Sequence, residues 1–288
     1  MASWGTTTCL SVAMLACAPL ATAGPGCAEV GSPIVISRAL GETSGIAIGR
    51  VDPDVLWTHN DGNSDLYTLD RAGAVTGRIA VSPRLRDWED IEISACASGS
   101  CLYFSDTGDN RERRPAGQSG IFRVAEPRSN QESVDPDAFP IRFPDGPRDV
   151  EALYVLPGEV PHLVTKGASH AITVYRYPPP LRPDTVTLVE VQRLSDGPVG
   201  LLDRVTGASA SPDGRTVGVR TYQSLRLYRV EGDTLVAVDG GVVNLRTLQE
   251  IQGEGVGIGP DGLVALTSEG GPLGGPPSLR LMRCRLGG

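Results

Sequence analysis

The 288-residue sequence is poor in aromatic residues, which make up 5% of it, and in histidine, of which it has three. The histidines, His59, His162 and His170, are too far apart in the sequence to suggest a metal-binding triad. It has no apolar run of about eighteen residues, so we expect no membrane-spanning helix. It also lacks a G-x-S-x-G motif, which argues against the nucleophile elbow of an α/β-hydrolase.

Helical periodicity is missing as well, whereas 36 glycines and 23 prolines punctuate short β-like runs. These features predict an all-β fold. The formal charge is −8, and the basic residues are scattered along the chain. We therefore expect neither nucleic acid nor an anionic membrane as a partner.

The N-terminal segment differs from the rest of the chain. Residues 9–24, CLSVAMLACAPLATAG, form an apolar run that ends in A-T-A at 21–23, which is typical of a secretory signal cleaved after Ala23, although no Lys or Arg precedes the run. A lipoprotein anchor at Cys17 is the alternative, but the preceding residues fit a lipobox poorly. We expect a leader over residues 1–23, one domain over residues 24–288, and a secreted, periplasmic or cell-envelope protein.

Four cysteines remain after the leader: Cys27, Cys96, Cys101 and Cys284. In an oxidising compartment an even number of cysteines predicts two disulfides, with three possible connectivities. The segment CASGSC (96–101) suits a bridge across a short turn, which would leave Cys27 to pair with Cys284. The spacing does not fit a zinc site.

A repeat organises the rest of the sequence. Small or acidic residues lead into a β-like run, a turn, a second apolar run and a third, five times in succession. Five copies over residues 24–288 give about 53 residues each, which predicts a five-bladed β-propeller of four-stranded antiparallel blades. The fifth copy lacks a fourth strand, which PIVISRAL (33–40) can supply. This closure would bring Cys27 alongside Cys284. The copies begin at SGIAIG (44–49), WEDIEI (88–93), VEALYV (150–155), TGASAS (206–211) and GEGVGI (253–258).

The first strand of each blade begins, and the second ends, at the same face of a propeller. Two rings of polar residues should therefore meet at one mouth of the channel, with Asp61 close by. Three glutamates among them would repel one another unless a hard cation such as Ca²⁺ binds between them. The alternative is a metal-free plug in which Lys166 and Arg220 neutralise Glu151 and its neighbours. The first ring is Ser44, Glu89, Glu151, Thr206 and Glu254, and the second is Asn60, Asp106, Lys166, Arg220 and Ser268 or Glu269.

The heads S-G-I, E-D-I, E-A-L, T-G-A and E-G-V resemble those of the SdiA-regulated family of bacterial β-propellers. They are more distantly similar to esterase-like and phytase-like propeller domains. The resemblance covers about residues 40–286. It implies a metal ion, calcium, near the axis, with Glu89, Glu151 and Glu254 as ligands and Ser44 and Thr206 nearby. The family supplies no activity to carry over. The two expected disulfides and the basic NRERR insertion (110–114) depart from its pattern, so the family's partner-binding surfaces are not carried over to this sequence.

Three functions are open at this point. The first is an exported, calcium-stabilised propeller that binds a small anionic ligand or a protein at the mouth through Asn60, Lys166, Arg220 and Glu269. The second is a metal-dependent phosphoesterase or lactonase, in which Lys166 and Arg220 hold the anionic group and His59 or Asp106 acts as the base. The third is a structural scaffold that uses the outer faces of the blades.

Overall fold

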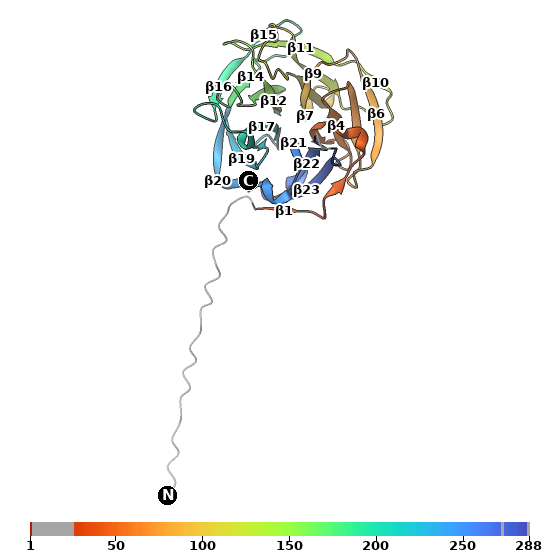
Figure 1. Ribbon diagram of the computed structural model, residues 1–288, viewed down its shortest axis with the longest axis vertical. Coiled ribbons are helices and arrows are strands. Elements are labelled where there is room, and N and C mark those ends of the chain that lie inside the picture. Colours follow the sequence, from red (N-terminus) through yellow and green to blue (C-terminus); the bar gives the residue numbers. More distant parts are fainter. Residues whose placement is uncertain (2–25, 272–273, 287–288) are drawn as a thin grey trace.

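The computed structural model describes residue 1 and residues 26–271 and 274–286. Its strands form five sheets that surround a central axis like the blades of a propeller (Figure 1), which confirms the predicted fold. Helices within the described residues are short 3-10 turns. Apart from Met1, the expected leader lies outside the described residues, so cleavage after Ala23 stays a prediction.

Blades 1 and 2 are each built from four successive antiparallel strands and a short fifth. The fifth strands, β10 (Ser133–Val134) and β15 (Val186–Thr187), are parallel additions to the outer edges of blades 1 and 2, and each comes from a loop of the following blade. They cover edges that would otherwise be open to pairing with another chain. From the axis outwards, blade 1 contains β3 (Thr43–Ile48), β4 (Leu56–Asn60), β5 (Asp65–Leu69) and β6 (Val75–Val81), and blade 2 contains β7 (Trp88–Cys96), β8 (Gly99–Asp106), β9 (Ser119–Ala125) and β11 (Asp137–Arg142).

Blades 3 and 4 have four strands each. Two 3-10 turns flank blade 4, namely η2 (Leu201–Asp203) before it and η3 (Leu245–Leu248) after it. Blade 3 contains β12 (Val150–Leu156), β13 (Val160–Thr165), β14 (Thr173–Arg176) and β16 (Val189–Arg193), and blade 4 contains β17 (Val205–Ala210), β18 (Thr216–Thr221), β19 (Ser224–Glu231) and β20 (Thr234–Asn244).

Blade 5 joins the two ends of the chain, as the sequence predicts. It contains β21 (Gln252–Ile258), β22 (Leu263–Glu269) and β23 (Ser278–Cys284), and β23 pairs with both β1 (Cys27–Glu29) and β2 (Ile34–Val35). Strands β1 and β23 lie side by side in Figure 1, and a disulfide joins Cys27 to Cys284 across their pairing. The second expected disulfide, Cys96–Cys101, bridges the β7–β8 hairpin.

The closing strand is shorter than the expected 33–40. After β2 the chain turns into η1 (Arg38–Leu40), where Ser37 Oγ accepts a hydrogen bond from the N–H of Ala39 and Leu40 becomes fully buried. Burial of Leu40 in the apolar cluster that joins blades 1 and 5 explains why this turn replaces the end of the strand.

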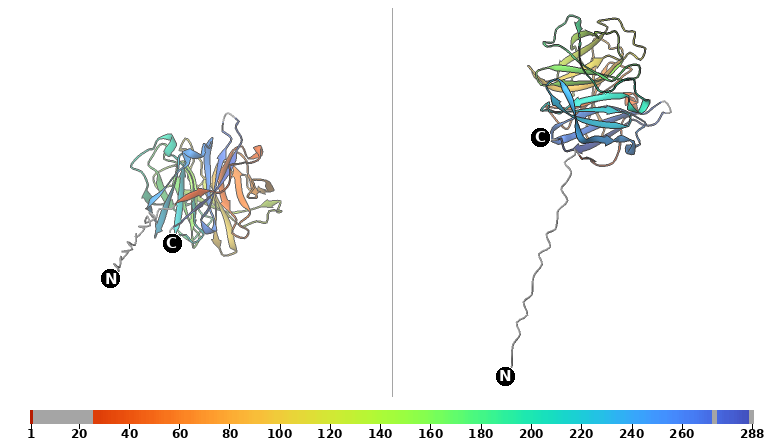
Figure 2. Two further views of the ribbon diagram at one scale, coloured as in Figure 1. Left: turned by 90° about the horizontal axis from the view of Figure 1, so that it is seen from below. Right: turned by 90° about the vertical axis from the view of Figure 1, so that its left-hand side faces the viewer.

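The five inner strands, β3, β7, β12, β17 and β21, contact one another in a closed ring, and connecting loops gather on its two faces (Figure 2). Apolar clusters fill the spaces between adjacent blades. Trp57 of β4 and Trp88 of β7, for example, are both buried in the cluster between blades 1 and 2. Within the described residues, no helix is long and apolar enough to cross a membrane.

Candidate functional site

Each blade carries a β-bulge at the start of its inner strand, where the pairing with the second strand shifts register. A bulge leaves a residue unpaired in the ladder and changes the direction of its side chain. All five residues of the predicted first ring lie inside these shifts, namely Ser44, Glu89, Glu151, Thr206 and Glu254.

Where the inner strands begin, the blades surround a cavity of about 150 Å³. We call it the acidic cavity, because its wall contains six carboxylates and one basic side chain. Six of the predicted site residues belong to this wall. The lining residues are Ser44, Asp61, Asp87, Glu89, Asn110, Glu151, Lys166, Tyr222, Gln252, Glu254 and Glu269.

Glu89 is the acid that most clearly lacks a counter-ion. It is 8% exposed and lines the cavity, and no described residue makes an ion pair or hydrogen bond with its carboxylate. A Cβ at Gly108 would lie 1.9 Å from Glu89 Oε1, so glycine at this position leaves the space that the carboxylate occupies. Burial raises the pKa of Glu89 well above its usual value, and the nearby Glu151 and Asp87 raise it further.

Lys166 is the only lysine in the sequence, and it is already paired. Its Nζ lies 2.7 Å from Glu151 Oε1 and 3.6 Å from Asp149 Oδ2, and it donates a 3.2 Å hydrogen bond to Asn110. Burial lowers the pKa of Lys166, but these two carboxylates more than compensate and raise it above its usual value. Burial raises the pKa of Glu151 to about 7, although Lys166 opposes the shift. Lys166 is therefore the counter-ion of Glu151 and Asp149 in blade 3.

The remaining acids of the cavity repel one another. Burial raises the pKa of Glu254 well above its usual value, with Glu151 and Glu269 adding to the shift, although Gln252 donates a 2.8 Å hydrogen bond to it. Burial likewise raises the pKa of Glu269 to about 7 and of Asp61 to about 6. Six acids against one paired ammonium favour the entry of a cation.

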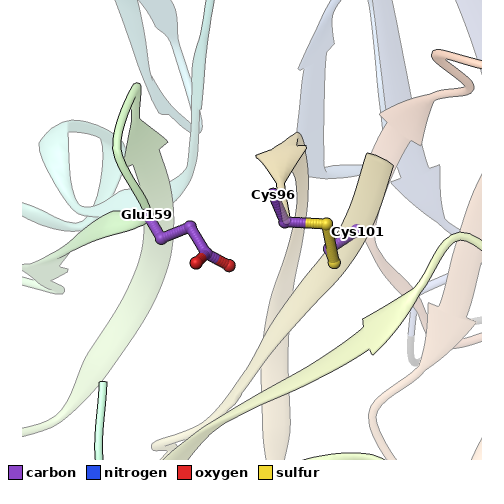
Figure 3. Close-up of side chains that lie close together, drawn as sticks. All are labelled: Cys96, Cys101 and Glu159. Carbon is purple, nitrogen blue, oxygen red and sulfur yellow. A yellow bond between two sulfur atoms is a disulfide. The ribbon is translucent and has the colours of Figure 1, made fainter. Parts of the chain in front are cut away.

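The three ring glutamates are not packed closely enough to enclose a bare ion. Within the described residues, one group of three His, Cys, Asp or Glu side chains has its ligand atoms within 4.8 Å of one another, and it is Cys96, Cys101 and Glu159 (Figure 3). Both sulfur atoms of that group form the disulfide, so no thiolate is available there. The acidic cavity therefore fits a cation that keeps some of its water between the carboxylates.

Arg220, expected to contact a ligand, does not line the cavity. It is fully buried, and its guanidinium donates hydrogen bonds of 2.6 and 2.9 Å to the carbonyls of Gly255 and Thr267. It also forms a 2.5 Å ion pair with Glu250. These contacts join blade 4 to blade 5, so the structure gives Arg220 an architectural role in place of the expected one.

The two expected catalytic bases are also outside the cavity wall. His59 is fully buried against the Trp88 ring, with 4.1 Å between centroids, and burial lowers its pKa to about 3. Its Nε2 accepts a hydrogen bond from the N–H of Gly45. Asp106 forms a 2.6 Å ion pair with Arg114 and accepts hydrogen bonds from the N–H groups of Arg86 and Asp87. Neither position suits a general base for a substrate in the cavity.

The hydroxyl groups of the first ring connect blades. Thr206 Oγ1 donates to the carbonyl of Glu254, and Ser44 Oγ donates to the carbonyl of Glu89. Thr206 does not line the cavity, whereas Ser44 does. Asn60, also outside the wall, donates from Nδ2 to the carbonyl of Ala39, and its main-chain carbonyl accepts a hydrogen bond from Trp88 Nε1.

Two further acids of β7, Asp90 and Glu92, are buried between the inner strands. Asp90 Oδ2 accepts hydrogen bonds from the N–H groups of Leu153 in β12 and Ala208 in β17. Glu92 Oε2 accepts from the N–H of Ala210. Of the acids in β7, Glu89 thus lines the cavity, whereas Asp90 and Glu92 are buried between the inner strands.

Sequence reasoning missed four lining residues: Asp87, Asn110, Tyr222 and Gln252. Asp87 and Gln252 stand two positions before a ring glutamate, so extending the repeat by two residues would have found them. Asn110 and Tyr222 lie on loops after β8 and β18, where the copies have no common pattern.

No family model and no curated protein matches the sequence. The structure is similar to that of the PQQ-bound aldose sugar dehydrogenase from Streptomyces coelicolor, with a TM-score of 0.55 and 12% identity over 91% of this chain and 99% of that chain. It is also similar to a streptogramin B lyase, with a TM-score of 0.43 and 12% identity over 88% and 97% of the two chains. A virginiamycin B lyase from Staphylococcus aureus is similar with a TM-score of 0.41 and 10% identity, over 85% of this chain and 68% of that chain. At such low identity, the first likeness shows that the chain has the β-propeller fold and nothing more specific.

Proposed function

We propose that this protein is an exported β-propeller that binds a divalent cation, calcium, in the acidic cavity, and that the cation stabilises the mouth at which a ligand or partner binds. The observation that carries the proposal is Glu89, a carboxylate at 8% exposure that faces the cavity without a partner among the described residues. A buried carboxylate is costly unless it is neutralised or paired, and a bound cation would supply the missing charge.

Calcium is the preferred ion because of the donor atoms. The described wall offers carboxylates, the amides of Asn110 and Gln252 and the hydroxyl of Ser44, and it contains no histidine and no cysteine. Such oxygen donors suit hard cations, and Ca²⁺ tolerates irregular geometry and bound water better than Mg²⁺ does. The expected ligand Thr206 is outside the wall and is not part of the proposal.

The hydrolase alternative is weaker on this geometry. Arg220 and His59 lie outside the cavity wall, and Lys166 is paired with Glu151. Among its described residues, the wall thus offers no unpaired basic group to hold the expected small anionic ligand. The resemblance to the SdiA-regulated family adds no activity, so the proposal is limited to binding. The two disulfides support an extracytoplasmic location.

The test is calcium binding to the purified protein, measured by elemental mass spectrometry, calorimetry and thermal melting with and without chelator. We expect about one calcium per chain and a melting temperature that rises with calcium more than with magnesium. Glu89→Gln should weaken calcium binding at least tenfold, because it removes the unpaired charge. The control Glu132→Gln alters an exposed acid outside the cavity and should change nothing. Absence of binding after calcium is added back would refute the proposal.

A further inference from the structure

A second hollow lies next to the acidic cavity, on the side of blades 4 and 5. It has a volume of about 400 Å³, within the usual range of small-molecule sites, which is about 300 to 1,000 Å³. We call it the apolar groove. The turns η2 and η3 contribute Leu201, Leu202 and Leu245 to its wall, and Ile251 comes from the segment that leads into β21.

Three apolar side chains around this groove are exposed in a way that the fold does not require. Leu201 is 61% exposed, Leu202 48% and Ile251 53%. Single exposed apolar residues are normal on a protein surface, but three around one hollow form a patch that suits an apolar ligand. Leu201 and Leu202 belong to η2, none of whose residues is buried, whereas η3 buries Leu245 and Leu248 in the apolar cluster between blades 4 and 5.

The groove and the acidic cavity are adjacent, because Tyr222 and Gln252 line both of them. A ligand long enough to pass these two side chains would contact both hollows. Tyr222 is partly buried at this junction and follows β18, whereas Gln252 starts β21. The boundary between the two hollows therefore includes an aromatic ring and an amide.

The charges of the two hollows differ and define the orientation of a ligand. The cavity has six carboxylates and one lysine that is already paired. In the groove, Glu250 is paired with Arg220, and Arg246 is exposed. A positive group is thus favoured in the cavity, while Arg246 disfavours a second positive group in the groove.

We propose that the mouth binds a small organic cation with an apolar arm, with the cationic end in the acidic cavity and the arm in the apolar groove. This inference rests on the cavity of the proposed function but does not require calcium. A monovalent ammonium donates hydrogen bonds to carboxylates, as Lys166 does to Glu151, and would compete with calcium for Glu89.

The test uses simple probes and titration calorimetry on the purified protein, in calcium-free buffer and then with saturating calcium. The probes are butylamine, octylamine and octanoate. We expect octylamine to bind at least tenfold more tightly than butylamine, because each methylene buried in the groove increases affinity about fourfold. Octanoate, which has a similar arm and the opposite charge, should bind far more weakly, and calcium should displace octylamine.

Matched variants separate the arm from the charge. Leu202→Ser and Ile251→Ser should each weaken octylamine binding several-fold and leave calcium binding unchanged. Val242→Ser, at a 59% exposed site on β20 outside the groove, should change neither. Glu89→Gln should weaken both ligands.

The outcomes distinguish the two proposals. Equal affinities for butylamine and octylamine, or for octylamine and octanoate, would overturn the proposed ligand class. Calcium binding without octylamine binding would overturn it too and leave the calcium site standing. Octylamine binding without calcium binding would support the ligand class and refute the calcium proposal.

Discussion

Asp90 Oδ2 accepts a 3.0 Å hydrogen bond from the N–H of Ala208, although the two residues are 118 positions apart in the sequence. The same oxygen accepts from the N–H of Leu153, so one carboxylate joins blades 2, 3 and 4 at the axis. Space for it depends on Gly45, where a Cβ would lie 2.8 Å from Asp90 Oδ1.

Replacement of Asp90 should therefore destabilise the whole ring. Asp90→Ala leaves the buried N–H groups of Leu153 and Ala208 without an acceptor, which costs about 2 to 6 kcal/mol in the free energy of unfolding. Asp90→Asn keeps one acceptor oxygen and should cost less. Urea unfolding of both variants checks this, with Asp54→Ala, at an exposed ion pair, as the control. A loss below about 1 kcal/mol for Asp90→Ala would show that water replaces the carboxylate.

The two disulfides should differ in their contribution to stability. Cys27–Cys284 closes a loop with a sequence separation of 257, whereas Cys96–Cys101 closes one of 5. In the chain-entropy description the first contributes about 5 kcal/mol and the second about 2 kcal/mol. Urea unfolding of the two double Cys→Ser variants should show this order. Equal losses would indicate that the unfolded chain is already compact near its ends.

Acid pH should destabilise the protein through His162. Its ring is fully buried and stacked on Tyr154, and burial lowers its pKa to about 4 from about 6.5. Between these values the unfolded state binds more protons than the folded state, so stability falls as pH decreases from about 6.5 to about 4. The loss attributable to this residue is roughly 3 kcal/mol at the end of that range.

His162→Phe keeps an aromatic ring over Tyr154 and removes the titrating group. Its unfolding free energy, measured by urea titration at several pH values, should decrease less between pH 6.5 and pH 4 than that of the unmodified protein. His170→Gln removes a half-exposed histidine and is the control. An unchanged slope for His162→Phe would mean that other groups account for the acid sensitivity.

The fold was predictable because the repeat is local. Each copy specifies its own hairpins through alternating residues and turns, and five copies fix the number of blades. The pairing of Cys27 with Cys284 then follows from the closure of the ring. The length of the closing strand was not predictable, since the burial of Leu40 depends on residues of blade 5.

The site was predictable in part. The repeat placed Glu89, Glu151 and Glu254 correctly near the starts of three of the five inner strands, and these residues line the cavity. Position at the end of a strand does not specify the direction of a side chain, so Arg220 was assigned to the mouth although it points between blades 4 and 5. The sequence also did not show that the side chains of Glu89 and Asp90 lie in different places, because this difference arises from the β-bulge at the start of β7.

Lys166 should control cation affinity in the acidic cavity, because its ammonium contacts Glu151 and approaches Asp149. Lys166→Met removes the only positive charge among the described residues of the cavity wall, so we expect calcium to bind at least tenfold more tightly. Without calcium the same variant should melt at a lower temperature, since two buried carboxylates lose their counter-ion.

Lys166→Arg is the matched control, because it keeps the charge and should leave the calcium affinity within about threefold of the original. Calorimetric titration with calcium and melting curves in chelator would be measured for both variants. Weaker calcium binding in Lys166→Met would mean that Lys166 organises the cation site. The explanation that excess negative charge in the cavity attracts calcium would then be wrong. Tighter binding together with lower stability in chelator is the result that a calcium site made of mutually repelling acids requires.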